Sequence, residues 1–137
     1  MTAPLAPPTL EEARALGASL RRVDSQLVRQ PPGCSRTWWK SGELYVEATV
    51  DRVDGAIVLV EVCCRGRVVR FTTERGLVTS VTDEAVVSDG TPKSRLEQQD
   101  PTQRDAVIDV ALALAEGSAD PELVEAAAVV AAGRAQP

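Results

Sequence analysis

Histidine is absent from this chain of 137 residues, and aromatic side chains make up only 3% of it. Histidine is the side chain that most often serves as a general acid or base near neutral pH, and it is the commonest metal ligand. Its absence excludes Ser-His and Cys-His mechanisms. The glycines stand singly, so neither standard glycine-rich phosphate loop is present. The sequence therefore favours a non-catalytic protein and predicts neither a metal nor a cofactor.

Long apolar runs and strongly basic segments are missing as well. No run approaches the roughly 20 residues that a membrane-spanning helix requires, and residues 1–8 lack the basic residues and apolar core of a secretory signal. The net charge is −5, whereas a nucleic-acid-binding surface normally carries an excess of positive charge. We therefore expect a small acidic cytoplasmic protein that binds neither membrane nor nucleic acid. The preference for arginine, alanine and valine indicates a GC-rich bacterial gene.

Cysteine is scarce. Cys34, Cys63 and Cys64 are an odd set without CxxC spacing, which supports neither a disulfide framework nor a zinc site. Cys63 and Cys64 are adjacent in a predicted strand, so their side chains point to opposite faces and do not bridge. We interpret them as small apolar strand residues in a reducing compartment.

Two patterns keep an enzymatic alternative open. Cys63 precedes a group of arginines whose positive charge would favour a thiolate; these are Arg65, Arg67 and Arg70. Glu47 and Glu61 are predicted to face each other across two strands, and paired carboxylates can share a proton where water is excluded. The structural interpretations are preferred, because a valine-rich strand is the usual place for an unreactive cysteine and compensated charge rows are common on sheets.

Glycines at the ends of short polar segments mark four tight turns between residues 36 and 81. The predicted turns are Ser41-Gly42, Val53-Asp54-Gly55, Arg65-Gly66 and Glu74-Arg75-Gly76. They join five strands into an antiparallel β-meander in sequence order, with Ala48 opposite Val60 and Glu61 opposite Arg70. One face is then apolar and forms the core: Thr37, Trp39, Leu44, Val46, Ala48, Val50, Val58, Val60, Val62, Cys64, Val69, Phe71, Leu77 and Val81.

Three helices complete the predicted fold, which belongs to the α+β class. Helix 10–29 is amphipathic: Thr9 and Glu12 form a capping-box pattern. An apolar stripe follows at 4-3-4 spacing, made of Leu16, Leu20, Val23 and Leu27. After the meander we expect a polar loop over 83–99 and helices over 101–116 and 121–132, which begin with Asp-Pro pairs and end at glycines. Residues 9–132 form a single domain, with flexible ends at 1–8 and 133–137.

The face of the meander opposite the core carries charges and apolar side chains together. A predicted cross-strand charge row consists of Arg36, Glu47, Glu61, Arg70 and Ser80. Beside it lies an apolar-aromatic row of Trp38, Tyr45, Cys63 and Val68. A bare apolar patch of this kind usually marks an interaction site. We therefore predict that the apolar-aromatic row, with Arg36 at its rim, binds a protein partner or a second copy of the chain.

The function expected from these features is that of a non-catalytic interaction subunit of the adaptor, chaperone-like or inhibitor type. The alternative is a small-ligand sensor, in which the sheet and a covering helix enclose an apolar pocket near Trp38, Tyr45 and Phe71. The two hypotheses differ in whether the Trp38 face is open or is covered by a helix that leaves a cavity.

Overall fold

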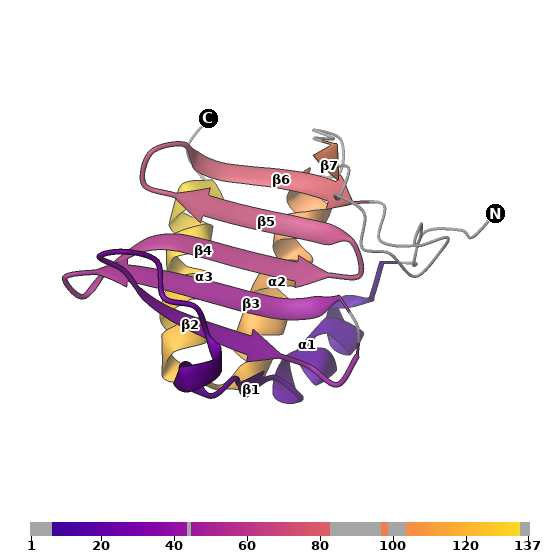
Figure 1. Cartoon of the computed structure of the whole chain (residues 1–137). Helices are drawn as coiled ribbons and strands as arrows, with labels where there is room; N and C mark the ends of the chain where they lie inside the picture. The colour runs from indigo at the N-terminus through magenta and orange to yellow at the C-terminus, as the bar shows by residue number, and fades with distance from the viewer. Residues whose placement is uncertain (1–6, 44, 83–96, 99–103, 135–137) are drawn as a thin grey trace, which may run out of the picture.

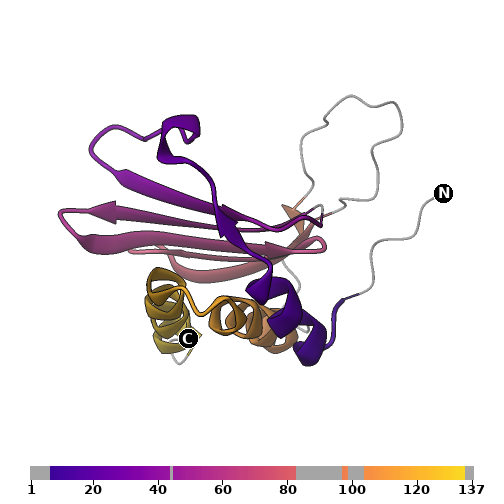
Figure 2. The same ribbon diagram turned by 90° about the horizontal axis from the view of Figure 1, so that it is seen from below.

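The fold consists of one antiparallel sheet and one layer of helices. The computed structural model describes residues 7–43, 45–82, 97–98 and 104–134. The predicted α+β class is confirmed, but the sheet has seven strands rather than five, because a two-residue strand is added at each edge. The strands follow one another in sequence order (Figure 1), and the helices lie against one face of the sheet (Figure 2).

The elements are α1 (Leu10–Ala18), β1 (Arg21–Arg22), the 3-10 helix η1 (Ser25–Leu27), β2 (Ser35–Lys40), β3 (Val46–Val53), β4 (Ala56–Cys64), β5 (Arg67–Thr72), β6 (Gly76–Thr82), β7 (Glu97–Gln98), α2 (Arg104–Ser118) and α3 (Pro121–Arg134). Apart from β7, the predicted loop over 83–99 lies outside the described residues. The same holds for the predicted start of a helix at residue 101, for Leu44, and for most of the predicted flexible ends.

The central meander from β2 to β6 is confirmed, but part of its register is not as predicted. Glu61 pairs with Arg70, as expected. Ala48 pairs with Val62, so the prediction that it lies opposite Val60 is wrong by two residues. A shift of two residues preserves the alternation of side chains, so the predicted core face is kept from Leu59 to Cys64 despite the error. Before Leu59 the prediction is wrong, because Ile57 packs against the core and the predicted Val58 does not.

Two single-residue shifts between β3 and β4 add up to this difference. The turn contains only Asp54 and Gly55, both with positive φ, as in the two-residue hairpins that favour Asp-Gly. A β-bulge between Asp51 and Arg52 adds the second shift. Neither shift alone would have kept the valines of both strands on the core face.

The turn between β2 and β3 is longer than the predicted pair at 41–42. Lys40 pairs with Glu47, so the chain uses residues 41–45 to reverse direction. The shifted register between β3 and β4 also places Glu47 opposite Cys63, so the predicted pairing of Glu47 with Glu61 is wrong. The predicted charge row is not continuous, because Ser80 also pairs with a residue other than the predicted Arg70.

The helices cover the face that the sequence assigns to the core. Its buried strand residues are Trp39, Val46, Ala48, Val50, Val60, Val62, Cys64 and Val69, and the buried helix residues include Val107, Ile108, Val110, Ala111, Leu114, Leu123, Ala126 and Val130. Removing one such valine or leucine side chain from water contributes about 1.5–3 kcal/mol. The core between the sheet and the helices is therefore the main source of stability.

The first helix is much shorter than predicted. The capping box is confirmed, since Thr9 Oγ1 accepts a hydrogen bond from the Glu12 amide at 3.1 Å and the Glu12 carboxylate accepts one from the Thr9 amide at 3.2 Å. The helix ends at Ala18, however, and β1 then pairs with β2. The Ser19 hydroxyl donates to the Leu16 carbonyl at 2.6 Å, a side-chain bond that competes with helix continuation. The prediction of a helix over 10–29 is wrong beyond residue 18.

Two glycines allow α1 and α2 to pack backbone against backbone. A Cβ at Gly17 would collide with the Leu114 carbonyl, and a Cβ at Gly117 would lie 2.8 Å from Arg14 Cα and closer still to its carbonyl oxygen. Gly117, which the sequence suggested as the end of a helix, lies inside α2. Its role is therefore close packing and not helix termination.

Asp120 joins the helix layer to the sheet. Its carboxylate caps α3 by accepting from the Glu122 amide at 3.0 Å, and it accepts both from the buried Trp39 indole at 3.0 Å and from Arg22. The two oxygens of Asp120 each lie 2.9 Å from a guanidinium nitrogen of Arg22. These bonds, led by the one from Arg22, hold the pKa of Asp120 well below its usual range.

Candidate functional site

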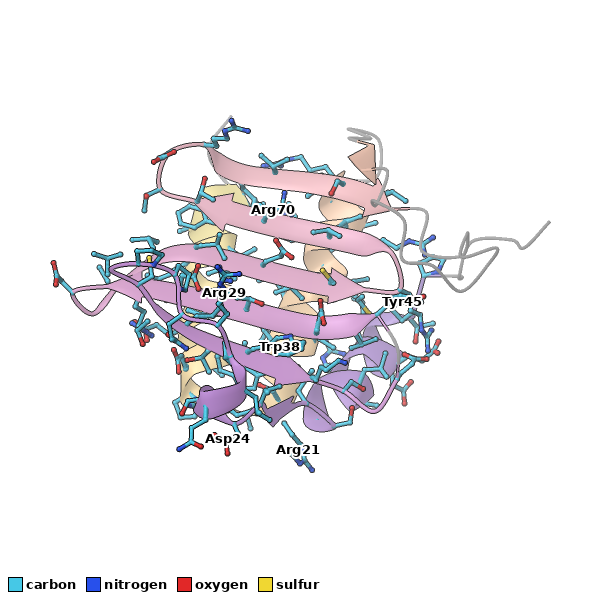
Figure 3. The ribbon with its side chains drawn as sticks, viewed as in Figure 1. Arg21, Asp24, Arg29, Trp38, Tyr45 and Arg70 are labelled. Atoms are coloured by element: carbon cyan, nitrogen blue, oxygen red, sulfur yellow. The ribbon has the colours of Figure 1, made fainter. Side chains whose placement is uncertain are left out.

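The predicted partner-binding residues do not form one row. Trp38 is half-buried in β2 on the face away from the helices, whereas Tyr45 lies in the β2–β3 turn at one end of the sheet (Figure 3). Cys63 and Val68 pair across β4 and β5, and their exposed fractions are only 2% and 1%. A buried side chain offers no surface to a partner. Of the predicted residues, the structure brings together Trp38 and Arg36.

These two side chains line a shallow pocket of about 230 Å³, which we call the Trp38 pocket. Its lining residues are Leu27, Val28, Arg29, Arg36, Trp38, Glu47 and Thr49. The first three belong to the segment that follows β1, and the others belong to β2 and β3. The pocket therefore forms where the chain crosses back over the sheet, on the side opposite the helices (Figure 2).

Hydrogen bonds to the backbone of β2 hold this crossing segment in place. The Val23 amide donates to the Trp38 carbonyl at 2.8 Å. The Gln30 side chain forms the pair of hydrogen bonds that a neighbouring strand would form with β2. Its oxygen accepts from the Arg36 amide at 2.6 Å, and its nitrogen donates to the Arg36 carbonyl at 3.1 Å. Val28, between these two anchors, is buried. The wall of the pocket is thus fixed by the fold at both ends.

Of the positively charged side chains around the pocket, one forms an ion pair and two do not. Arg36 forms two short bonds to Asp51, at 2.7 and 2.8 Å, and these bonds raise the pKa of the guanidinium. The Lys40 ammonium lies 5.4 Å from the Trp38 ring centroid, within the range of a cation–π contact. Arg29 projects over the sheet on the same side as Trp38 (Figure 3). In the described part of the chain, neither Arg29 nor Lys40 forms an ion pair.

The catalytic alternatives find little support in this geometry. Burial raises the pKa of the Cys64 thiol to about 11. Cys63 is also buried, and its sulfur lies 3.8 Å from the Glu61 carboxylate, a neighbour that disfavours a thiolate. Glu61 forms an ion pair with Arg70 at 2.8 Å. Among residues 7–43, 45–82, 97–98 and 104–134, no three His, Cys, Asp or Glu side chains come together as a metal site.

The sensor alternative requires an apolar cavity between the sheet and the helices. At the centre of that interface, the space lined by Val60, Leu112 and their neighbours measures only about 10 Å³, close to the minimum for one water molecule. A larger, open groove of about 950 Å³ lies at the β5–β6 turn, where Phe71 and α3 line it. Phe71 packs against the core on the helix side, so it does not share a pocket with Trp38 on the other side. Trp38 and Phe71 therefore line two separate pockets, unlike the single pocket of the sensor hypothesis.

Sequence reasoning missed the wall formed by Leu27, Val28 and Arg29, because an apolar spacing that continues past residue 18 was interpreted as helix. One local signal for the true structure was present. Asp24 accepts from the Gln26 amide at 2.9 Å, an Asx-type bond that begins a turn. Leu27, which was placed on the buried stripe, is 76% exposed.

Among the described residues, no helix is both long and apolar enough to cross a membrane. Comparison with known proteins gives no match: no protein-family model fits the chain, and no curated protein or solved structure is significantly similar to it. The chemistry of the site is therefore the basis for a functional proposal.

Proposed function

We propose that this chain is a non-catalytic interaction subunit that binds a partner protein through the Trp38 pocket. The observation that carries the proposal is a half-buried tryptophan on the helix-free face of the sheet, with charged side chains around it. Binding energy at protein interfaces usually concentrates at aromatic centres with polar rims. Leu27, exposed at the mouth of the pocket, adds a second apolar contact.

The size of the pocket favours a protein partner over a small molecule. Sites for small ligands usually enclose about 300–1,000 Å³ and bury most of the ligand, whereas the Trp38 pocket is open and measures about 230 Å³. A pocket of this size accepts one or two side chains of a larger surface. Such an interface needs contacts around the pocket as well as within it.

The charges favour a partner with acidic residues beside the inserted side chain. Arg29 and Lys40 flank Trp38 and form no ion pair in the described chain. A carboxylate placed between them would gain two charge-assisted contacts. This local preference differs from the acidic character of the whole protein, whose net charge is −5.

The experiment begins with partners captured from the native host by the wild-type chain and by Trp38→Ala. A protein retained only by the wild type is then purified and titrated against both forms by calorimetry. We expect Trp38→Ala to weaken the affinity by more than about tenfold, because truncating a central tryptophan typically costs about 2 kcal/mol or more. Arg29→Ala should weaken it by a smaller factor.

Val124→Ala is the matched control, since Val124 is an exposed apolar residue of α3, far from the pocket lining. Thermal melts establish that all variants remain folded. Equal affinities of Trp38→Ala and Val124→Ala would contradict the proposal. Tyr45→Ala measures how far the contact extends, because the sequence placed Tyr45 beside Trp38 and the structure places it at the end of the sheet.

A further inference from the structure

Most of the crossing segment, residues 23–30, lies exposed on the side of the sheet opposite the helices (Figure 2). After Val23 only Val28 is buried, and the 3-10 helix η1 contains no buried residue. Leu27 is 76% exposed. Few apolar contacts are lost when such a segment leaves the sheet. Segments of this kind open locally while the rest of a fold stays intact.

The crossing segment is attached to β2 near its two ends. At one end, the Val23 amide donates to the Trp38 carbonyl at 2.8 Å. At the other end, the Gln30 side chain accepts from the Arg36 amide at 2.6 Å and donates to the Arg36 carbonyl at 3.1 Å. Gln30 thus supplies two of these three hydrogen bonds, and losing its side chain removes the attachment at that end.

Internal hydrogen bonds make the crossing segment one body. The Leu27 amide donates to the Asp24 carbonyl at 2.8 Å, and the Asp24 carboxylate accepts from the Gln26 amide at 2.9 Å. The Val28 amide donates to the Ser25 carbonyl at 3.2 Å. None of these bonds involves β2. The segment therefore keeps its own turn when it leaves the sheet, and its attachments are released together.

The chain is fixed on both sides of the segment. Before it, β1 pairs with β2, and Arg22 is bound to Asp120 by two hydrogen bonds of 2.9 Å. After it, the Cys34 amide donates to the Pro31 carbonyl at 3.1 Å. Gly33, inside this turn, has a φ of +74° and no atom within 4 Å of its Cβ position. Glycine adopts either sign of φ at little cost, so the turn provides a point of backbone rotation.

We propose that the crossing segment opens and closes as one unit, that the Gln30 side chain keeps it closed, and that this movement regulates the Trp38 pocket. Three of the seven lining residues belong to the unit: Leu27, Val28 and Arg29. The open form therefore lacks one wall of the pocket. Gln30 does not line the pocket, so it is a positioning residue. A partner that contacts this wall binds the closed form and increases its population.

This regulation rests on the function proposed for the Trp38 pocket, whereas the opening itself is measured without a partner. Native-state hydrogen exchange of the wild type is followed by NMR at low urea concentrations. We expect the Val23 and Arg36 amides to show the same opening free energy and the same small dependence on urea. Amides of the central strand β4 should show a larger value of both. Movement of the Gln30 side chain alone would free the Arg36 amide and leave the Val23 amide protected.

Two glutamines of the segment provide matched variants. Gln30→Ala should accelerate exchange of the Val23 amide at least about tenfold, because two hydrogen bonds to β2 are lost. Gln26 is also exposed, and its side chain forms no hydrogen bond in the described chain. Gln26→Ala should therefore change this rate by less than about twofold. Gln30→Glu keeps the acceptor but loses the donor, and its effect should lie between the two.

The neighbours Leu27 and Val28 test the apolar contact in the same way. Val28 is buried and Leu27 is exposed. Val28→Ala should accelerate exchange of both the Val23 and the Arg36 amides by at least about fivefold, and Leu27→Ala by less than about twofold.

The Trp38 indole signal reports the state of the pocket. It should shift in Gln30→Ala, where the wall is displaced, and stay in place in Gln26→Ala. An unchanged signal in Gln30→Ala would show that the segment does not regulate the pocket.

Other outcomes would overturn the opening itself. One is a wild type in which the Arg36 amide exchanges with a lower opening free energy than the Val23 amide. Another is a Val23 amide whose exchange is the same in Gln30→Ala and in Gln26→Ala. A third is exchange of both amides only with global unfolding, at the values of β4. These results would leave the function proposed for the pocket standing, and failure to capture a partner would leave the opening standing.

Discussion

The two faces of the sheet are built from the same strands but are stabilised differently. The buried centre of the helix-covered face is apolar and, around Val60 and Leu112, leaves a space of only about 10 Å³. The other face relies on ion pairs, such as Arg36 with Asp51 and Glu61 with Arg70, and it carries the Trp38 pocket. Alternation along each strand therefore separates the residues that hold the fold from those available for recognition.

The largest difference between the faces is expected from neighbouring residues of β4. Val60 is 1% exposed and points to the helices, whereas Glu61 is half-buried on the other face. Val60→Asp buries an unpaired carboxylate and should lower the free energy of unfolding by about 4 kcal/mol or more. Glu61→Gln keeps the shape of the side chain and should cost less than about 1 kcal/mol. Urea denaturation followed by circular dichroism measures both.

The comparison fails if both substitutions move the denaturation midpoint equally. Val60→Asp is the variant at risk of not folding at all, so Val60→Ala serves as a milder form. Its expected loss of about 1–3 kcal/mol still exceeds that of Glu61→Gln.

The next largest effect is expected within the helix layer, where Gly117 touches the backbone of α1. Gly117→Ala gains about 1 kcal/mol of helix propensity, but its methyl group would overlap backbone atoms of Arg14, so the backbone of α1 would have to shift. We expect a net loss of about 1–3 kcal/mol. Gly42→Ala is the control, because nothing lies within 4 Å of its Cβ position and its φ is not positive. A Gly117→Ala variant as stable as the wild type would show that α1 is displaced at little cost.

Much of the face assignment could be predicted from the sequence, since alternation needs only local information. Val50 of β3 and Val60 and Val62 of β4 were placed on the correct face even though the pairing of Ala48 was wrong. The bulge at Asp51 and the length of the first turn depend on which distant strand each segment meets. No local pattern specifies the length of a turn or the position of a bulge. The predicted register was therefore wrong where turns of different length are compatible with the same alternation of side chains.

The candidate site was less predictable than the fold. The sequence identified Trp38 as a site residue because it is an aromatic residue on the face away from the core. It did not identify Arg29, because that residue was assigned to a helix. The Gln30 bonds exist because β2 offers the backbone groups of Arg36 to the crossing segment. Such contacts join residues whose proximity follows only from the tertiary fold.

The smallest expected effect concerns the charge of Asp120, which joins the helix layer to the rim of the sheet. Because its pKa is lowered in the folded state, ionised Asp120 stabilises the protein above the ordinary aspartate pKa of about 3.9. This contribution is lost as the pH falls below that value toward the folded pKa. Asp120→Asn retains a side chain that caps α3 well but removes the charge that Arg22 contacts. We expect it to lower the free energy of unfolding by about 1 kcal/mol at pH 7.

The pH dependence separates this charge effect from a packing effect. The difference in unfolding free energy between the wild type and Asp120→Asn should shrink between about pH 5 and pH 2, since over that interval Asp120 of the unfolded wild type binds a proton while Asp120 of the folded protein stays ionised. Asp54→Asn, in the exposed β3–β4 turn, is the matched control and should show no such convergence. A gap for Asp120→Asn that stays constant with pH would mean that the Trp39 and capping hydrogen bonds, and not the pairing with Arg22, are what Asp120 contributes.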